Sequence, residues 1–464
     1  MLFNSFVFII LFLPVTFGGY FLLQKIRPQL ASIWLAFASL FFYAYWNIVY
    51  LPILLFSILF NYILSIYITP GFEKSLKEKA RKCVFLFAII FNLGLLGFFK
   101  YSNFFIENIN ILVGSHIQTL KILLPLGISF FTFQKIAYLV DCYKGKAHEK
   151  NFLRYLLFVT FFPQLIAGPI VHHSEIMPQF AEKEKRTLNF ENISKGLFLF
   201  FLGLSKKVVI ADTFATWANS GFNGTSALGF FDAWMTSLSY TFQLYFDFSG
   251  YTDMAIGIAL LFNIVLPQNF NSPYKALNIQ DFWRRWHMTL SRFLRDYIYI
   301  PLGGNKLGEW KTYRNLFLVF LIGGLWHGAS WMFVIWGTLH GLAIVVHRLW
   351  QKGAIEIPRF VAWFLTFNFI NITWVFFRAA DMESALRVLK GMFLPFEDIF
   401  PVLFGPKTVI VLLLGSILVF FFKNSYETLQ KWSPQLWHLL IVWALFFVSF
   451  YSMSGFSEFL YFNF

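Results

Sequence analysis

The sequence predicts an all-α polytopic membrane protein, and three observations lead to this prediction. Of the 464 residues, 58% are hydrophobic and 22% are aromatic, whereas only 13% are charged. A soluble globular chain has about 45–50% apolar and about 25% charged residues, so lipid must cover much of this apolar surface. Apolar runs of about 20 residues also recur along the chain, and a helix needs that length to cross a bilayer.

The apolar runs predict about 11–13 membrane-spanning helices, because several runs are short or interrupted. The first run lacks a basic start and a small-residue cleavage site, so we expect a retained helix rather than a signal peptide. Pro and Gly within 124–143 and 161–175 predict broken or re-entrant helices around a cavity. No low-complexity linker separates soluble domains, and the longest polar loop, 172–195, is too short for a domain, so residues 1–464 are expected to form a single membrane-embedded domain. In order, the runs are 5–24, 30–47, 49–69, 83–99, 121–140, 152–171, 196–211, 226–246, 253–267, 314–350 (long enough for two helices), 359–377, 403–422 and 433–452.

The charge pattern predicts the orientation of the chain. The formal net charge is +14, and basic loops follow the first, third and fifth runs, whereas the loops after the second and fourth runs are nearly neutral. Because basic loops stay in the cytoplasm, the N-terminus is expected outside it. The basic residues are dispersed among the helices, which argues against nucleic-acid binding. Cys83 and Cys142 belong to no disulfide or zinc motif, so no metal site is predicted.

A strongly charged segment lies at residues 280–297, QDFWRRWHMTLSRFLRDY. Its apolar residues recur at three- and four-residue steps, which predicts an amphipathic helix of about 18 residues with Asn278 as its N-cap. Asp281 can pair with Arg285 one turn later. His287 shares the apolar side, which should face protein or a cavity. The alternative is an interfacial helix with arginines on lipid headgroups. The candidate donor-binding or cavity-lining residues here are Trp283, Arg284, Arg285, Trp286 and Arg292.

A second candidate site is the histidine inside the apolar segment FLVFLIGGLWHGASWMFVIWGTLHG, residues 317–341. A polar group in hydrocarbon costs a few kcal/mol unless it is satisfied, so His327 is a functional candidate. Gly323, Gly324 and Gly328 would let a substrate or another backbone approach it. A core histidine bonded to a neighbouring helix is the alternative, and for His340 it is the favoured one. Trp326 and Ser330 are further candidate lining residues.

Two acidic residues interrupt the apolar segment YTFQLYFDFSGYTDMAIG, residues 240–257. Acids at membrane depth usually pair with bases or line a water-filled path. Asp247 and Asp253 could therefore pair with Arg284, Arg285 or Arg292, or belong to the site. They could also serve a transporter or channel, although the chain lacks the internal repeats that many transporters show.

The histidines fit acyl transfer better than other chemistry. The chain has no phosphate-binding loop, no nucleophile-elbow motif and no zinc-protease motif. Ser330 follows His327 too closely to be assigned as a nucleophile. A histidine without a protein nucleophile suits general-base catalysis, in which it takes a proton from a hydroxyl that attacks an acyl donor.

Several segments together resemble the membrane-bound O-acyltransferase family, in particular its bacterial alginate and peptidoglycan O-acetyltransferase-like branch. They are FDFSGYTDMAIGIALLFNIVLPQNFNSPYKALNIQDFWRRWHMTLSRFLRDYIYIPLGGN, LIGGLWHGASWMFVIWGTLHG, LPLGISFFTFQKIAYLVDCY, LIAGPIVHHSEI and WVFFRAADMESALRVLKGM. The resemblance implies a helical disc around a central tunnel, with His327 as the catalytic histidine and His287 as the second polar residue of the site. His287 would orient the donor or stabilise the oxyanion.

The same resemblance implies the substrates and the location. The donor would be a cytoplasmic acyl thioester, acetyl-CoA or an acyl carrier, with no tightly bound cofactor. The acceptor would be a hydroxyl of alginate, peptidoglycan or another extracytoplasmic polysaccharide, reached directly or through a periplasmic SGNH-type partner. The protein would lie in the bacterial cytoplasmic (inner) membrane. D-alanyl transfer to teichoic acid from a carrier protein is the alternative within the family.

Overall fold

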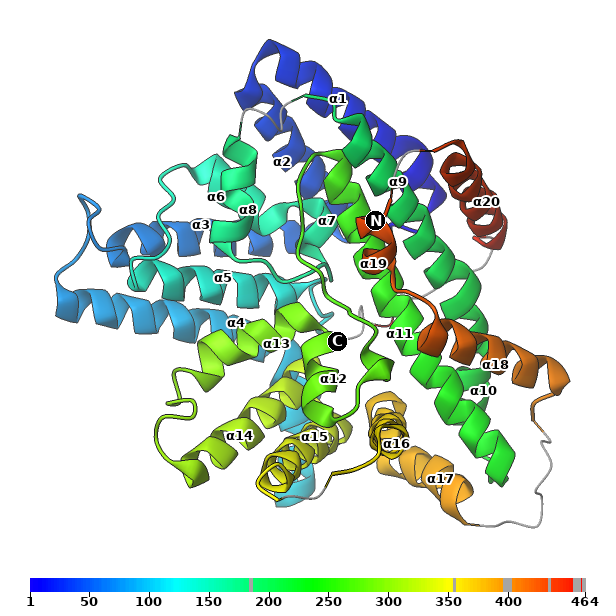
Figure 1. Ribbon diagram of the computed structural model, residues 1–464. Helices are drawn as coiled ribbons and strands as arrows, with labels where there is room; N and C mark the ends of the chain where they lie inside the picture. Colours follow the sequence, from blue (N-terminus) through cyan, green and yellow to red (C-terminus); the bar gives the residue numbers. More distant parts are fainter. Residues whose placement is uncertain (183–186, 354–355, 395–402, 433–434, 454–459, 461–464) are drawn as a thin grey trace. The chain divides into compact units, whose positions relative to one another are not determined.

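The regular structure of the protein is helical. The computed structural model describes residues 1–182, 187–353, 356–394, 403–432, 435–453 and 460. Within these ranges no β-strand occurs, and helices follow one another from end to end (Figure 1). The all-α prediction is therefore confirmed. A helix satisfies its own backbone hydrogen bonds, which lipid cannot do for it.

The chain separates into two compact units, of which the first consists mainly of Met1–Phe201 and Tyr251–Pro267. Helices α1 and α2 lie side by side in it, as do α3, α4 and α5 (Figure 1). Its helices are α1 (Leu13–Ile26), α2 (Pro28–Ala44), α3 (Leu51–Ile68), α4 (Glu78–Val113), α5 (Ile128–Tyr143), α6 (Phe152–Thr160), α7 (Phe162–Leu165), α8 (His173–Ala181) and most of α9 (Phe190–Ser205).

Broken helices occur in the first unit where the sequence predicts them. Gly127 has a left-handed backbone (φ 69°) and precedes α5, and a Cβ there would lie 2.9 Å from the Leu165 carbonyl oxygen. Phe161 separates α6 from α7 within the run 152–171. The prediction of broken helices is confirmed at these two places, and the cavity that the sequence predicts around them stays a prediction.

The second unit consists mainly of Leu202–Gly250, Gln268–Ser433 and Trp437–Phe464. The long helix α11 (Phe230–Leu261) starts in this unit and ends in the first. That residues 1–464 form a single domain stays a prediction. The other helices of the second unit are η4 (Lys206–Ala211, π-helical), α10 (Asp212–Asn223), α12 (Ile279–Arg285), α13 (Met288–Leu294), η6 (Arg295–Tyr299, π-helical), α14 (Glu309–His327), α15 (Trp331–Trp350), α16 (Arg359–Arg378), α17 (Met382–Phe393), α18 (Pro406–Phe421), α19 (Ser425–Gln430) and most of α20 (Leu436–Ser452).

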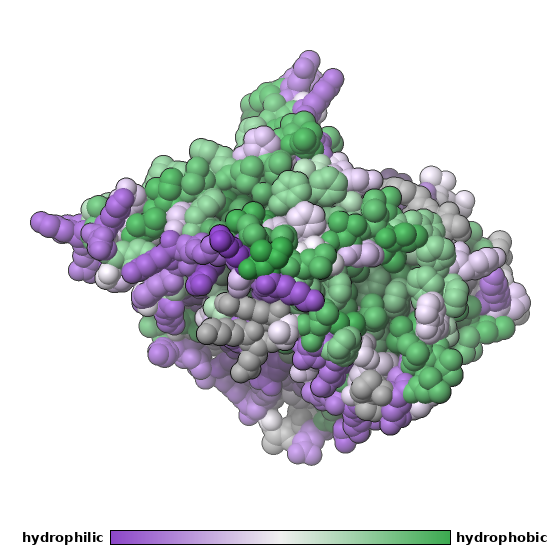
Figure 2. Space-filling model, turned by 90° about the horizontal axis from the view of Figure 1, so that it is seen from above, coloured by the Kyte–Doolittle hydropathy of each residue, from purple (hydrophilic) through white to green (hydrophobic). Residues whose placement is uncertain are grey.

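The surface and the helix lengths fit a multi-pass membrane protein. Hydrophobic residues cover much of the face seen in Figure 2. Among the described residues, five helices are long and apolar enough to cross a membrane: Val7–Ile26, Ile48–Ile68, Glu78–Val113, Trp331–Trp350 and Arg359–Arg378. Shorter apolar helices are Pro28–Ala44, Pro406–Phe421 and Leu436–Ser452.

In the part of the chain that the structure describes, fewer uninterrupted spans appear than the predicted 11–13, because some apolar runs are not single helices. The run 152–171 breaks at Phe161, and the run 196–211 passes from α9 into the π-helical η4. The run 314–350 forms two helices, α14 and α15, as predicted. A central tunnel stays a prediction.

Candidate functional site

The segment that carries His287 is a broken helix rather than the continuous one that the sequence predicts. Asn278 caps α12 as expected, because the Asp281 backbone N–H donates to its Oδ1 at 2.8 Å. Helix α12 ends at Arg285, and α13 begins at Met288. Between them His287 has φ 43° and ψ 53°, a left-handed backbone that costs about 1–3 kcal/mol in a non-glycine residue. The prediction of one 18-residue helix is wrong at this turn.

A neighbouring backbone segment holds the strained turn in place. The Met288 N–H donates to the Asn269 carbonyl at 2.9 Å, and the Asn271 N–H donates to the Arg285 carbonyl at 2.9 Å. Tertiary contacts thus override the helical periodicity that residues 280–297 show. Such strained residues persist where the surroundings fix them, and they gather at functional sites.

The Asn269 side chain fixes the imidazole of His287. Its Oδ1 lies 3.1 Å from His287 Nδ1, and it also accepts hydrogen bonds from the Thr289 N–H (3.2 Å) and the Thr289 hydroxyl (2.9 Å). His287 is fully buried, and its desolvation lowers the pKa of the imidazole to about 3. The ring is therefore neutral at physiological pH.

His327 is the last residue of α14 and is buried at 2% exposure. Its ring packs edge-on against Trp336 and against Phe377, both with centroids 5.1 Å away. Gly328 ends the helix in an extended conformation, and Ser330 then caps α15 by accepting the Met332 N–H at 3.2 Å. This chain reversal leaves the imidazole at a helix end among aromatic rings.

The glycines around His327 serve the contact between α14 and α15. A Cβ on Gly324 would lie 2.4 Å from the Phe333 carbonyl oxygen, and one on Gly328 would lie 2.1 Å from the Phe333 ring. A Cβ on Gly323 would meet Leu294 Cδ1 at an ordinary 3.5 Å. The sequence analysis allows these glycines to admit either a substrate or another part of the chain. Gly324 and Gly328 admit another part of the chain, namely Phe333.

One aromatic ring connects the two candidate histidines. The Trp326 ring lies 6.3 Å from the His287 ring and 4.9 Å from the His327 ring, measured between centroids. Phe248 of α11 packs edge-on against His287 at 4.8 Å. The structure therefore brings both histidines to the same buried aromatic cluster in the second unit.

His340 is a structural histidine. Its Nδ1 accepts the Trp283 indole N–H at 3.2 Å, and its Nε2 lies 3.1 Å from the Thr373 hydroxyl. The Thr373 hydroxyl donates to the Ile370 carbonyl at 2.9 Å, so its oxygen accepts from His340 Nε2. Both ring nitrogens are thus engaged between helices, as the favoured alternative for this residue predicts.

The remaining candidates of residues 280–297 divide into buried aromatic and more exposed basic residues. Trp286 is fully buried and packs on Trp374 at 5.1 Å. Arg285 pairs with Asp281 at 2.8 Å, as predicted. Arg284 is exposed and Arg292 is half-buried. Whether any of these side chains binds a donor stays a prediction.

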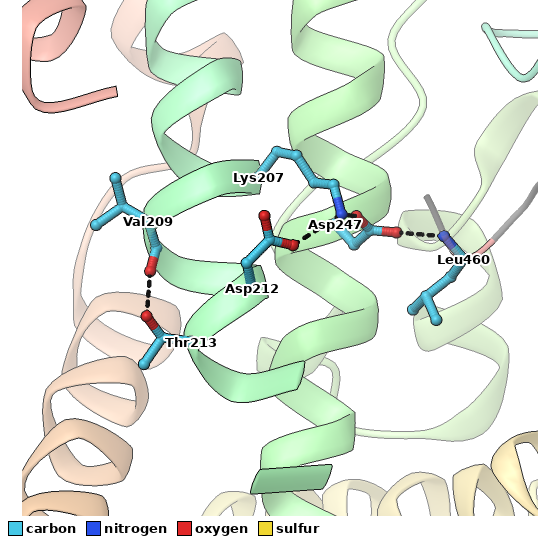
Figure 3. Close-up of polar contacts among 6 residues, drawn as sticks. All are labelled: Lys207, Val209, Asp212, Thr213, Asp247 and Leu460. Atoms are coloured by element: carbon cyan, nitrogen blue, oxygen red, sulfur yellow. Dashed lines mark hydrogen bonds and ion pairs between the residues drawn. The ribbon is translucent and has the colours of Figure 1, made fainter. Parts of the chain in front are cut away.

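Asp247 pairs with a lysine that the sequence analysis did not identify. Lys207 Nζ lies 2.7 Å from Asp247 Oδ1 and 2.9 Å from Asp212 Oδ1, and the Leu460 N–H donates to Asp247 Oδ2 at 3.0 Å (Figure 3). The expectation that Arg284, Arg285 or Arg292 supplies the cation for Asp247 is wrong. Asp253 is buried and belongs to the first unit.

The backbone explains why Lys207 reaches Asp247. A Cβ on Gly250 of α11 would lie 2.7 Å from the Gly203 carbonyl oxygen, so the two helices touch at this glycine. The π-helical η4 begins at Lys206, directly after α9. Lys207 (3% exposed) and Asp247 (1%) are both buried, so each charge needs its partner.

The sequence analysis missed Asn269, Phe248 and Lys207. Asn269 stands in the turn-rich segment QNFNSPYK, and nothing in that pattern indicates contact with His287. Among the described residues, no three metal-binding side chains gather into a cluster. The site offers two histidines and aromatic walls, a donor set that suits proton transfer and hydrogen bonding.

Comparison with known proteins agrees with this chemistry. The profile of the membrane-bound O-acyltransferase family matches residues 146–380. The chain is 56% identical over 423 residues to a Helicobacter pylori protein named peptidoglycan O-acetyltransferase, covering 84% of this chain and 80% of that one. It is 40% identical over 402 residues to the probable alginate O-acetylase of Pseudomonas aeruginosa, covering 85% and 75%. It is 29% identical over 244 residues to the teichoic acid D-alanyltransferase of Bacillus subtilis, covering 49% and 60%.

The family resemblance that the sequence motifs indicate is confirmed. Both candidate histidines, His287 and His327, lie within the matched residues 146–380. Their catalytic roles, like the donor-binding roles of the neighbouring residues, stay predictions. The chain belongs to the membrane-bound O-acyltransferase family and is a multi-pass membrane O-acyltransferase.

Proposed function

We propose that the protein transfers an acetyl group from a cytoplasmic thioester to a hydroxyl of an extracytoplasmic polysaccharide, and that peptidoglycan is the acceptor. The observation that carries the proposal is the pair of buried histidines beside Trp326. The similarity supports the substrate, because identity is 56% to the peptidoglycan O-acetyltransferase and 40% to the alginate O-acetylase. D-alanyl transfer has less support, at 29% identity over about half of the chain.

In the proposed mechanism, His327 is the general base. The acceptor oxygen attacks the thioester carbonyl carbon while His327 takes the hydroxyl proton. The new C–O bond forms, the C–S bond breaks, and the proton passes from His327 to the leaving thiolate, so the products are an ester and a free thiol. General-base assistance contributes about 10²–10⁴-fold in rate. His327 is buried among aromatic rings, and a reaction site closed to water would protect the thioester from hydrolysis.

The proposed location is the bacterial cytoplasmic membrane with the N-terminus outside the cytoplasm. The basic residues at the start of α4 support this orientation, since basic loops stay inside. Cys83 near that end is exposed, and Cys142 is buried. In right-side-out vesicles, a membrane-impermeant maleimide should label Cys83 only after the vesicles are opened. Labelling of Cys83 in sealed vesicles would reverse the orientation.

The function is tested with purified protein in sealed vesicles. Labelled acetyl-CoA is placed on the side that Cys83 reports as cytoplasmic, and a peptidoglycan fragment is placed on the other. Wild type should acetylate the fragment, and His327→Ala should lose at least about 100-fold of the rate while remaining folded. The control variant His148→Ala, which changes an exposed loop histidine, should keep the wild-type rate. Undiminished transfer by His327→Ala would refute the assignment.

The family resemblance leaves two routes to the acceptor, direct transfer by this chain and transfer through a periplasmic SGNH-type partner. The same vesicles distinguish direct transfer from relayed transfer. If the chain alone acetylates the fragment, no partner is needed. If acetyl transfer to the fragment requires an added periplasmic extract, and acetyl-CoA is consumed only in its presence, the relayed route holds.

A further inference from the structure

The contacts of Asn269 determine which of its side-chain atoms faces His287. The Thr289 backbone N–H lies 3.2 Å from the atom assigned as Oδ1, and a backbone N–H can only donate. The atom that faces Thr289 must therefore be the carbonyl oxygen and not the amide nitrogen. The same oxygen lies 3.1 Å from His287 Nδ1.

A carbonyl oxygen only accepts hydrogen bonds, so His287 Nδ1 must carry a hydrogen. In the neutral imidazole the other nitrogen then holds a lone pair. Phe248 of α11 and Trp326 of α14 pack their rings on His287, and neither side chain is charged. Nothing in these contacts favours a second ring proton.

We propose that Asn269 is a positioning residue that holds His287 as the Nδ1–H tautomer, so that His287 meets the substrates with a hydrogen-bond acceptor at Nε2. A neutral ring of this kind cannot donate from Nε2 to an oxyanion. It accepts a hydrogen bond from an O–H or N–H group of a substrate. Of the roles that the sequence analysis leaves open for His287, orientation of a substrate is thus retained and oxyanion stabilisation is not. The kinetic part of the test rests on the proposed function.

The first measurement does not depend on activity. In folded wild-type protein labelled with ¹⁵N-histidine, the His287 signals are identified by their loss in His287→Gln. They should show a protonated Nδ1 and an unprotonated Nε2 near neutral pH. A protonated Nε2 in wild type would overturn the proposal, whatever the fate of the proposed reaction.

The second measurement is the pH dependence of kcat in Asn269 variants. Asn269→Asp keeps an acceptor for Nδ1–H but adds a charge that favours imidazolium, and it should move the acid limb of the profile up by about 1–3 pH units. Asn269→Leu should lower kcat by about 10- to 100-fold, the usual effect of losing an orienting partner. An active Asn269→Asp with the wild-type profile, or Asn269→Leu with the wild-type kcat, would overturn the proposal.

A matched control separates positioning from stability. Asn371 is also fully buried, and its Oδ1 accepts the Thr241 hydroxyl at 2.6 Å rather than facing an imidazole. Asn371→Leu should lower stability and leave the pH profile in place. If Asn269→Leu does not fold, Asn269→Asp and the ¹⁵N spectrum still decide the question.

Discussion

Two buried histidines of the second unit, His287 and His340, show different uses of the same residue. His340 lies inside the regular helix α15, and both of its nitrogens join neighbouring helices through Trp283 and Thr373. His287 stands at a left-handed break between two short helices, and Asn269 holds its Nδ1. Burial is complete in both cases. The difference teaches that burial alone does not distinguish a structural histidine from a candidate site residue. Backbone strain sets His287 apart, because strained residues gather at functional sites.

The largest expected effect separates the two histidines by activity. His287→Ala should lower kcat by about 100-fold, because a misplaced substrate loses about that much rate. His340→Ala should lower the free energy of unfolding by about 2–5 kcal/mol, because it leaves a cavity and breaks two buried hydrogen bonds. Rates are measured per mole of folded protein, and unfolding is followed by denaturant titration. Equal losses of kcat in the two variants would break the comparison.

A buried ion pair extends the comparison to charged groups. Lys207→Met leaves Asp247 as a buried charge and should cost about 3–5 kcal/mol of stability. The double variant Lys207→Met/Asp247→Leu should recover most of that loss, since a well-packed apolar pair often replaces a buried ion pair without cost. Thermal unfolding of both variants is the measurement. If Lys207→Met is as stable as wild type, the ion pair is not needed for the fold.

The close contact between α14 and α15, the helix that carries His340, should be sensitive to one added methyl group. A Cβ on Gly337 would lie 2.6 Å from the Phe320 carbonyl oxygen, so Gly337→Ala should cost about 1–3 kcal/mol. Gly323→Ala is the matched control, because a Cβ there meets only an ordinary contact. It should be neutral or stabilise by up to about 1 kcal/mol. Similar stability changes in the two variants would contradict the close approach of α14 and α15.

The smallest expected effect is on the pH dependence of stability. Burial lowers the pKa of His287 to about 3 from the model-compound value of 6.5. Between these two values the unfolded chain binds a proton at this residue and the folded chain does not, so stability falls as pH falls through that window. His287→Gln should make this slope shallower by at most about 1.4 kcal/mol per pH unit. An unchanged slope would show that His287 is accessible to protons in the folded protein.

The local sequence predicts much of the fold and part of the site. The Asn278 cap, the Asp281–Arg285 pair and the α14–α15 hairpin depend on residues a few positions apart, and the structure has all three. The break at His287 depends on Asn269, which is 18 residues away in the sequence.

Partners distant in sequence leave no periodic signal. Asp247 illustrates this, because its cation is Lys207 of another helix and not one of the arginines in residues 280–297. Local spacing could show that Asp247 needs a cation at membrane depth. It could not show which helix supplies that cation.

The most direct test of the central claim is a double-mutant cycle on His287 and His327 with acetyl transfer as the readout. If the two histidines act in one step at one site, His287→Ala/His327→Ala should lose little more rate than the worse single variant, because residues that act as a unit are not additive. If the loss of rate in the double variant equals the product of the losses in the two single variants, the histidines act independently. That result would contradict a single site built around Trp326.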